Sequence, residues 1–123
     1  MEHQWTRKGQ VLLAIGFLIS PDRGRYIGYK LIPEYGNKSM RKKPRVELCN
    51  GLLHRVYSNE DNLIILRTRR PLTSEYPTNQ EAATAMKGLF NKKLLDGWII
   101  CKPAYPSTLL GLPWKHIRQV KLL

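Results

Sequence analysis

The stretch from Val11 to Ile32, VLLAIGFLISPDRGRYIGYKLI, is the most informative about the fold, because it contains two apolar segments separated by a turn. In Ser20–Gly24, Pro, Asp and Gly stand where a type I turn followed by a left-handed glycine favours them. Val11–Ile19 is much shorter than the roughly 20 apolar residues of a membrane-spanning helix, and its length favours a buried strand. Arg25–Ile32 alternates partially, as half-buried strands do, and Gly28 within it indicates a bulge or sharp bend. The stretch predicts a β-hairpin.

Three further short strands follow in the sequence. Arg45–Cys49 and Leu52–Ser58 flank Asn50-Gly51, which is the strongest short-range signal for a hairpin turn. Leu63–Arg70 is apolar at first and cationic at its end, and it predicts a fifth strand. Between the second and third strands, Pro33–Pro44 is bounded by prolines and rich in cations, so we expect an exposed loop. The five strands form a meander of antiparallel hairpins.

The hydrophobic period then changes from that of strands to that of a helix. Apolar residues between 79 and 95 recur at intervals of three and four, which predicts one amphipathic helix. Thr78 and Glu81 have the spacing of a capping box at its start. Gly97 is suited to the left-handed position just after its end.

Two apolar segments after the helix complete the sheet. Trp98–Lys102 is an apolar strand, and Trp114–Leu122 has the pattern of a closing strand. Residues 1–123 are therefore expected to form a single basic α+β domain. Its small antiparallel sheet, curved or barrel-like, consists of the five-strand meander plus the C-terminal strands, with the helix packed on it.

The net charge is the most unusual property of the chain. Lys and Arg number 21 against nine Asp and Glu, which gives +12 at pH 7 and a pI near 10.1. This excess of positive charge causes electrostatic self-repulsion, which a bound polyanion relieves. Nucleic acid is the commonest partner of this kind. The cations also cluster along the sequence: residues 21–45 hold eight basic against two acidic groups, residues 67–71 hold three arginines, and residues 87–121 hold seven basic groups against Asp96.

The basic clusters supply the expected contact surface for nucleic acid. Arg67 and Arg69 should project from one face of a strand, because side chains alternate with period two. Tyr35 is the best candidate for stacking on a base, whereas Tyr26, Tyr29 and Trp98 are expected to fill the core. The expected nucleic-acid-binding residues are Arg23, Arg25, Lys30, Tyr35, Lys38, Arg41, Lys42, Lys43, Arg45, Arg67, Arg69, Arg70, Lys115 and Arg118.

The same cations can also have a purely structural role. A run of charge such as Lys38–Arg45 often serves only to keep a loop solvated. Arg67 and Arg69 can equally pair with carboxylates on neighbouring strands. The carboxylates available for such pairing are Glu60, Asp61 and Glu75.

Catalytic and metal-binding motifs are absent from the sequence. Cysteines and histidines lack the paired spacings of a zinc site, so we expect no metal; no cofactor fingerprint is present either. The carboxylates that a nuclease would need, Asp22, Glu34 and Glu47, fall in a turn, a loop and a strand. Cys49 and Cys101 sit among apolar neighbours as reduced core thiols do, which favours an intracellular location, cytoplasmic or in the nucleoid or nucleus, with no membrane contact.

Three functions remain in order of preference. The first is a non-enzymatic nucleic-acid-binding module that contacts the phosphate backbone, with RNA or single strands favoured over duplex DNA because no major-groove helix is recognisable. The second is a small basic interaction protein or inhibitor that docks on an acidic protein surface. The third is a compact metal-dependent nuclease that uses Asp22 or Glu47. The sequence indicates no oligomeric state.

Overall fold

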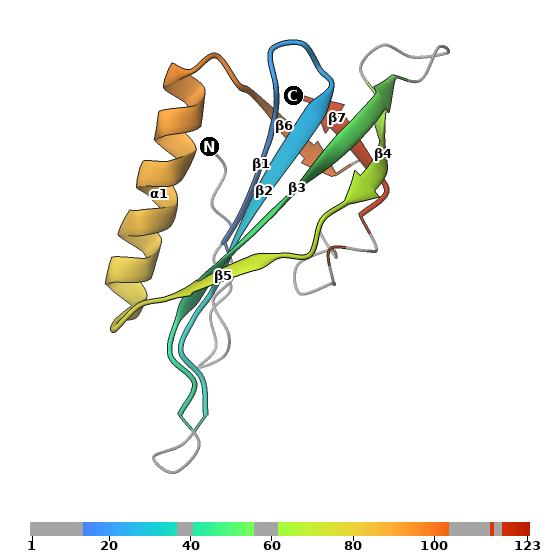
Figure 1. The fold of residues 1–123 in the computed structure, drawn as a ribbon. Coiled ribbons are helices and arrows are strands. Elements are labelled where there is room, and N and C mark those ends of the chain that lie inside the picture. Colours follow the sequence, from blue (N-terminus) through green and yellow to red (C-terminus); the bar gives the residue numbers. More distant parts are fainter. Residues whose placement is uncertain (1–13, 37–40, 56–61, 104–113, 115–116) are drawn as a thin grey trace.

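The computed structural model describes residues 14–36, 41–55, 62–103, 114 and 117–123. Within these ranges the chain forms a seven-stranded sheet and one helix (Figure 1). The elements are β1 (Ala14–Ile19), β2 (Arg25–Ile32), β3 (Arg45–Arg55), β4 (Asn62–Thr68), β5 (Leu72–Glu75), α1 (Asn79–Leu95), β6 (Ile99–Pro103) and β7 (Gln119–Leu122).

Six of the strands close into an antiparallel barrel. The sheet has the order β2-β1-β6-β7-β4-β3-β5, and the additional pairing of β2 with β3 completes the ring. β1 to β4 form a meander, after which β6 returns to pair with β1, and β7 joins β6 to β4. β5 lies outside the ring and extends the sheet along the first half of β3. The expected α+β fold with a curved antiparallel sheet and one helix is confirmed.

The predicted hairpin at Asn50-Gly51 is wrong, because β3 runs through both residues as one strand. Gly51 pairs with Tyr26 of β2 on one side and with Thr68 of β4 on the other. A Cβ at Gly51 would collide with the carbonyl oxygen of Arg67 and lie 2.8 Å from the Tyr26 ring. The glycine therefore allows a close approach of two strands, which is its other use within sheets.

The turn between β1 and β2 is present, but its left-handed residue is Arg23, with a φ of 61°, and not Gly24. The Asp22 side chain organises the turn: its Oδ1 accepts from the Gly24 backbone N–H at 2.9 Å and from the Ser20 hydroxyl at 2.6 Å. Of the bulge or sharp bend expected at Gly28, the bulge is wrong, because the register with both neighbouring strands passes through the glycine without a shift.

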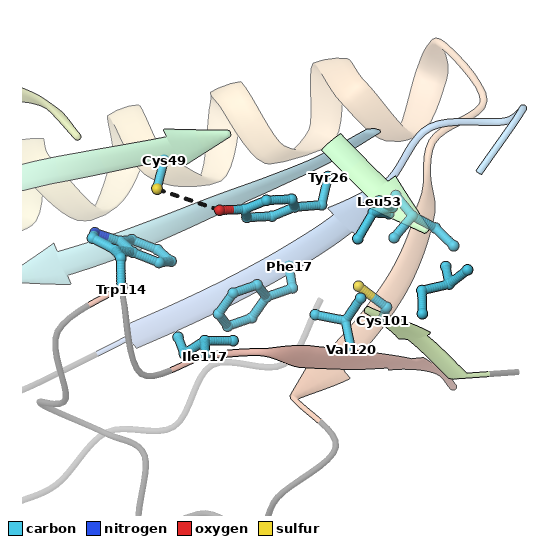
Figure 2. Packing of buried hydrophobic residues seen from close by; sticks show 10 residues of the cluster. Phe17, Tyr26, Cys49, Leu53, Cys101, Trp114, Ile117 and Val120 are labelled. Carbon is cyan, nitrogen blue, oxygen red and sulfur yellow. Dashed lines mark hydrogen bonds between the residues drawn. The ribbon is translucent and has the colours of Figure 1, made fainter. Parts of the chain in front are cut away.

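The interior of the barrel holds the first of two apolar cores (Figure 2). Trp114 packs edge-on against Phe17 with ring centroids 5.7 Å apart, and Gly28 leaves room for it, since a Cβ there would lie 2.5 Å from the indole. The Tyr26 hydroxyl donates to Thr68 Oγ1 at 2.9 Å and contacts Cys49 Sγ. Trp114 is thus a core residue that lies before β7, whereas it was expected to begin the closing strand.

The second core lies between the outer face of the sheet and α1. Ala82, Met86 and Phe90 recur along one side of the helix and pack against Leu18, Ile27, Tyr29, Leu31 and Val46. Thr78 caps the helix as predicted, its side chain accepting from the Glu81 N–H at 3.1 Å. α1 covers the outer face of the sheet at β1, β2 and the first half of β3. The outer face at the second half of β3 and at β4 is exposed, as Leu52 and Leu66 show.

β5 was not predicted as a strand, because Pro71 and the polar segment Leu72–Glu75 lack the apolar pattern of the other strands. All four of its side chains are exposed. No helix within the described ranges has the length and apolar character needed to cross a membrane.

Candidate nucleic-acid interface

Three arginines lie in two adjacent rows across the open outer face of the barrel. Paired residues in an antiparallel sheet lie on the same side of it. Arg25 of β2 pairs with Leu52 of β3, which pairs with Arg67 of β4. In the next row Ile27 pairs with Asn50, whose carbonyl oxygen accepts from the Arg69 N–H at 3.0 Å.

A β-bulge sets this alignment. The register of β3 against β4 shifts between Leu52 and Leu53, so that Leu52 pairs with Arg67 whereas Leu53 pairs with Ile65. Leu66 is the extra residue and is 62% exposed. If the register of Leu53 with Ile65 continued without the shift, Leu66 would stand opposite Leu52 in place of Arg67, and the arginines would be displaced from the row. We call Arg25, Asn50, Leu52, Arg67 and Arg69 the arginine face.

The arginines of the arginine face form no salt bridge with the acids that the structure describes. All three arginines are exposed, as is Arg70 beyond them. The one salt bridge among described residues joins Arg41 to Glu34, elsewhere on the molecule. Glu75, a candidate partner, makes no ion pair with these arginines, while Glu60 and Asp61 lie outside the described residues.

Asp22 is the acid whose charge acts on the arginine face. Its pKa is lowered, first by the hydrogen bond from the Ser20 hydroxyl, then by the Gly24 N–H, and also by the charge of Arg25. The carboxylate is therefore ionised at neutral pH and held by the turn. It places one negative charge at the edge of a face that carries three positive charges.

Trp98 and Lys93 extend the arginine face towards α1, and neither was among the expected contact residues. The Arg25 guanidinium carbon lies 5.9 Å from the centroid of the Trp98 ring, and Lys93 Nζ lies 4.8 Å from it. Trp98 was expected in the core, and its ring is partly buried against the outer core. In the sequence, Gly97 could have indicated where Trp98 lies, because a glycine that ends a helix fixes the backbone of the next residue.

A second group of cations lies in the arm that connects β2 to β3, between Ile32 and Arg45. Tyr35 and Lys42 form an antiparallel bridge, and Tyr35 is 43% exposed. The Arg45 guanidinium carbon lies 5.9 Å from the centroid of the Tyr35 ring. Lys42 and Lys43 are exposed, whereas the charge of Arg41 is paired with Glu34 at 2.6 Å. We call Tyr35, Arg41, Lys42, Lys43 and Arg45 the arm cluster.

The arm cluster is separate from the arginine face. Arg45 and Leu52 stand seven residues apart on β3, which corresponds to roughly 23 Å along the strand. An odd separation also places the two residues on opposite faces of the strand. The structure therefore gathers the expected contact residues into more than one surface.

The remaining expected residues fall in different environments. Lys30 is 5% exposed, with its Nζ 4.8 Å from the centroid of the Trp114 ring, so it lies inside and not on the expected contact surface. Burial lowers the pKa of Lys30, and the Glu47 carboxylate opposes that effect. Arg23 is half-buried in the turn, and Arg118 is exposed beside β4. Lys38 and Lys115 lie outside the described residues.

Lys102 and Lys121 form a like-charged pair across two strands that lie apart in the sequence. They are direct neighbours across β6 and β7, and both are exposed. Like charges opposite each other destabilise a sheet. A bound anion would relieve this repulsion as well.

The carboxylates of a possible nuclease site do not converge. Asp22 precedes β2 and Glu34 follows it, so the length of that strand separates them, while Glu47 pairs with Lys30 within the sheet. In the described part of the chain, no three His, Cys, Asp or Glu side chains are grouped so that they could hold a metal ion. Comparisons of the chain with protein-family models, curated proteins and solved structures gave no match.

Proposed function

We propose that the chain is a nucleic-acid-binding module whose arginine face contacts the phosphate backbone. The observation that carries this proposal is the pairing of Arg25, Leu52 and Arg67 in one row with Arg69 in the next. Each guanidinium can form a bidentate, charge-assisted pair with a phosphate. Contacts of this kind position a nucleic acid without selecting its sequence.

RNA or a single strand suits the arginine face better than duplex DNA. A major groove admits a helix or a two-stranded ribbon that carries base-reading side chains. The arginine face instead lies on the side of a closed barrel, around the exposed Leu52. The one helix in the described ranges is packed against the sheet through Ala82, Met86 and Phe90 and carries only scattered cations.

Arg67→Ala combined with Arg69→Ala tests the proposal. Both side chains are exposed, so the fold should be kept. Loss of two phosphate contacts should weaken binding about equally for oligonucleotides of different sequence. We expect a loss of roughly 10-fold or more, because even one hydrogen bond to a charged group contributes about 1.5–3 kcal/mol in general. Fluorescence anisotropy with labelled RNA and DNA single strands measures this loss.

The matched control is Lys87→Ala combined with Lys92→Ala, which removes the same charge from exposed positions on α1. Its affinity should stay close to that of the unmodified chain. Equal losses in the two variants would show that net charge alone drives binding. Tighter binding to an acidic polypeptide than to either oligonucleotide would favour docking on an acidic protein instead.

A further inference from the structure

The backbone of Trp98 is fixed by the end of α1. Trp98 N–H donates to the Lys93 carbonyl and Gly97 N–H to the Leu94 carbonyl, each at 3.0 Å, which is the bond pattern of a Schellman motif. Gly97 has the φ of 88° that this motif requires. A residue whose backbone is fixed in this way loses little backbone conformational entropy when a ligand binds it.

The ring of Trp98 packs against the outer core and also contacts two cations. It lies partly buried against the outer core, which anchors the indole. The ammonium of Lys93 and the guanidinium of Arg25 lie within 6 Å of its centroid, at 4.8 and 5.9 Å. Cation–π contacts of this kind require that the cations lie over the π-face of the ring.

We infer that Trp98 is a stacking platform for an unpaired base, so that the ligand of the arginine face is a single strand. This inference rests on the proposed function. Every base offers a π-face, so stacking tolerates any sequence, whereas a base within a duplex is already paired and stacked. The incoming base takes the place of the Lys93 ammonium, and Lys93 and Arg25 then pair with the flanking phosphates.

The position of Arg25 supports this assignment. Its guanidinium faces Trp98, and its backbone is in the row that continues to Leu52 and Arg67. Because neighbouring strands lie about 4.8 Å apart, Arg67 is roughly 10 Å from Arg25 along the row. A strand with a base on Trp98 can therefore lead its backbone onto the arginine face.

The test compares two probes of about twelve nucleotides, a length within the ~4–16 nucleotides that one small barrel covers. One probe is oligothymidine and the other is an abasic strand with the same phosphates. The unmodified chain should bind oligothymidine roughly 5- to 150-fold more tightly than the abasic strand, the factor expected for one stacked base. Trp98→Leu should lower oligothymidine affinity to that of the abasic strand and leave abasic binding unchanged, and Trp98→Phe should restore part of the preference.

The outcomes separate this inference from the proposed function. Equal affinity of the unmodified chain for the two probes overturns the stacking platform and needs no variant that must fold. The stacking platform is also overturned if Trp98→Leu keeps the full preference for oligothymidine. In both cases, salt-dependent binding to the abasic strand would still support the phosphate contacts of the proposed function. Absence of salt-dependent binding to either probe overturns both proposals.

Discussion

Gly51 and Gly88 show at the scale of single residues why a glycine in the sequence has more than one interpretation. Asn50-Gly51 has the composition of a hairpin turn, yet the structure uses the glycine to bring β3 close to Arg67 of β4. Such a close approach depends on strands that are distant in sequence, and a local pattern contains no information about them. Gly88 in α1 has open space around its Cα.

Gly51→Ala should destabilise the protein, because a Cβ would overlap the backbone of β4, which cannot move without breaking the sheet. We expect a loss of about 3 kcal/mol or more in the free energy of unfolding, at the upper end of ordinary single substitutions. Gly88→Ala is the matched control and should add about 0.5–1 kcal/mol, the difference between the two residues inside a helix. Urea denaturation measures both, and a neutral Gly51→Ala would contradict the tight packing of β3 on β4.

Cys101 makes stability depend on pH in the alkaline range. Burial raises the pKa of its thiol to about 12. The unfolded chain ionises this thiol from about pH 9 while the folded chain keeps it protonated, so the free energy of unfolding falls as pH rises through that window. Cys49 and Tyr26, whose pKa values burial also raises, act in the same direction, and Lys30, whose pKa is lowered, opposes them.

Cys101→Ala should make that decline shallower by at most about 1.4 kcal/mol per pH unit, the contribution of one proton. Chemical denaturation between pH 7 and about pH 12 measures it. Below about pH 8, where the thiol is protonated in both states, the two curves should run parallel. Equal slopes above pH 9 would mean that solvent reaches Cys101 in the folded protein.

At the scale of elements, the helix was the part that local sequence determined best. Its period, its Thr78 cap and its terminal Gly97 are all local features, and α1 begins and ends within the expected range. The β1–β2 hairpin is equally local and was predicted. β3 and β5 were not, because the length of β3 depends on partners on both sides, and β5 is held by pairing with β3 in spite of its polar, exposed side chains.

Thr78→Ala should destabilise the protein by about 1 kcal/mol, because the Glu81 N–H at the start of α1 would lose its acceptor. Thermal unfolding measures the change, and Thr78→Ser, which keeps the hydroxyl, should restore most of it. If Thr78→Ala left the midpoint unchanged, capping of α1 would not contribute to stability.

In the whole molecule, the pairing of β2, β3 and β4 decides which cations meet. Arg67 and Arg69 were expected on one face from the alternation of side chains, and Arg25 joins them because β2 and β4 both pair with β3. Local sequence patterns could not predict that arrangement. They also could not predict the burial of Lys30 inside the barrel or the distance between the arm cluster and the arginine face. Trp98 was missed because its packing involves both the outer core and two cations.

If phosphates bind to the arginine face, oligothymidine affinity must fall with salt concentration in a way that depends on Arg67 and Arg69. Each phosphate contact to a single strand contributes about −0.7 to the slope of log affinity against log salt concentration. Removing Arg67 and Arg69 together should therefore make the slope shallower by roughly 1.4, whereas removing Lys87 and Lys92 should leave it as it was. An unchanged slope in the arginine variant would contradict the claim that these side chains meet the phosphates.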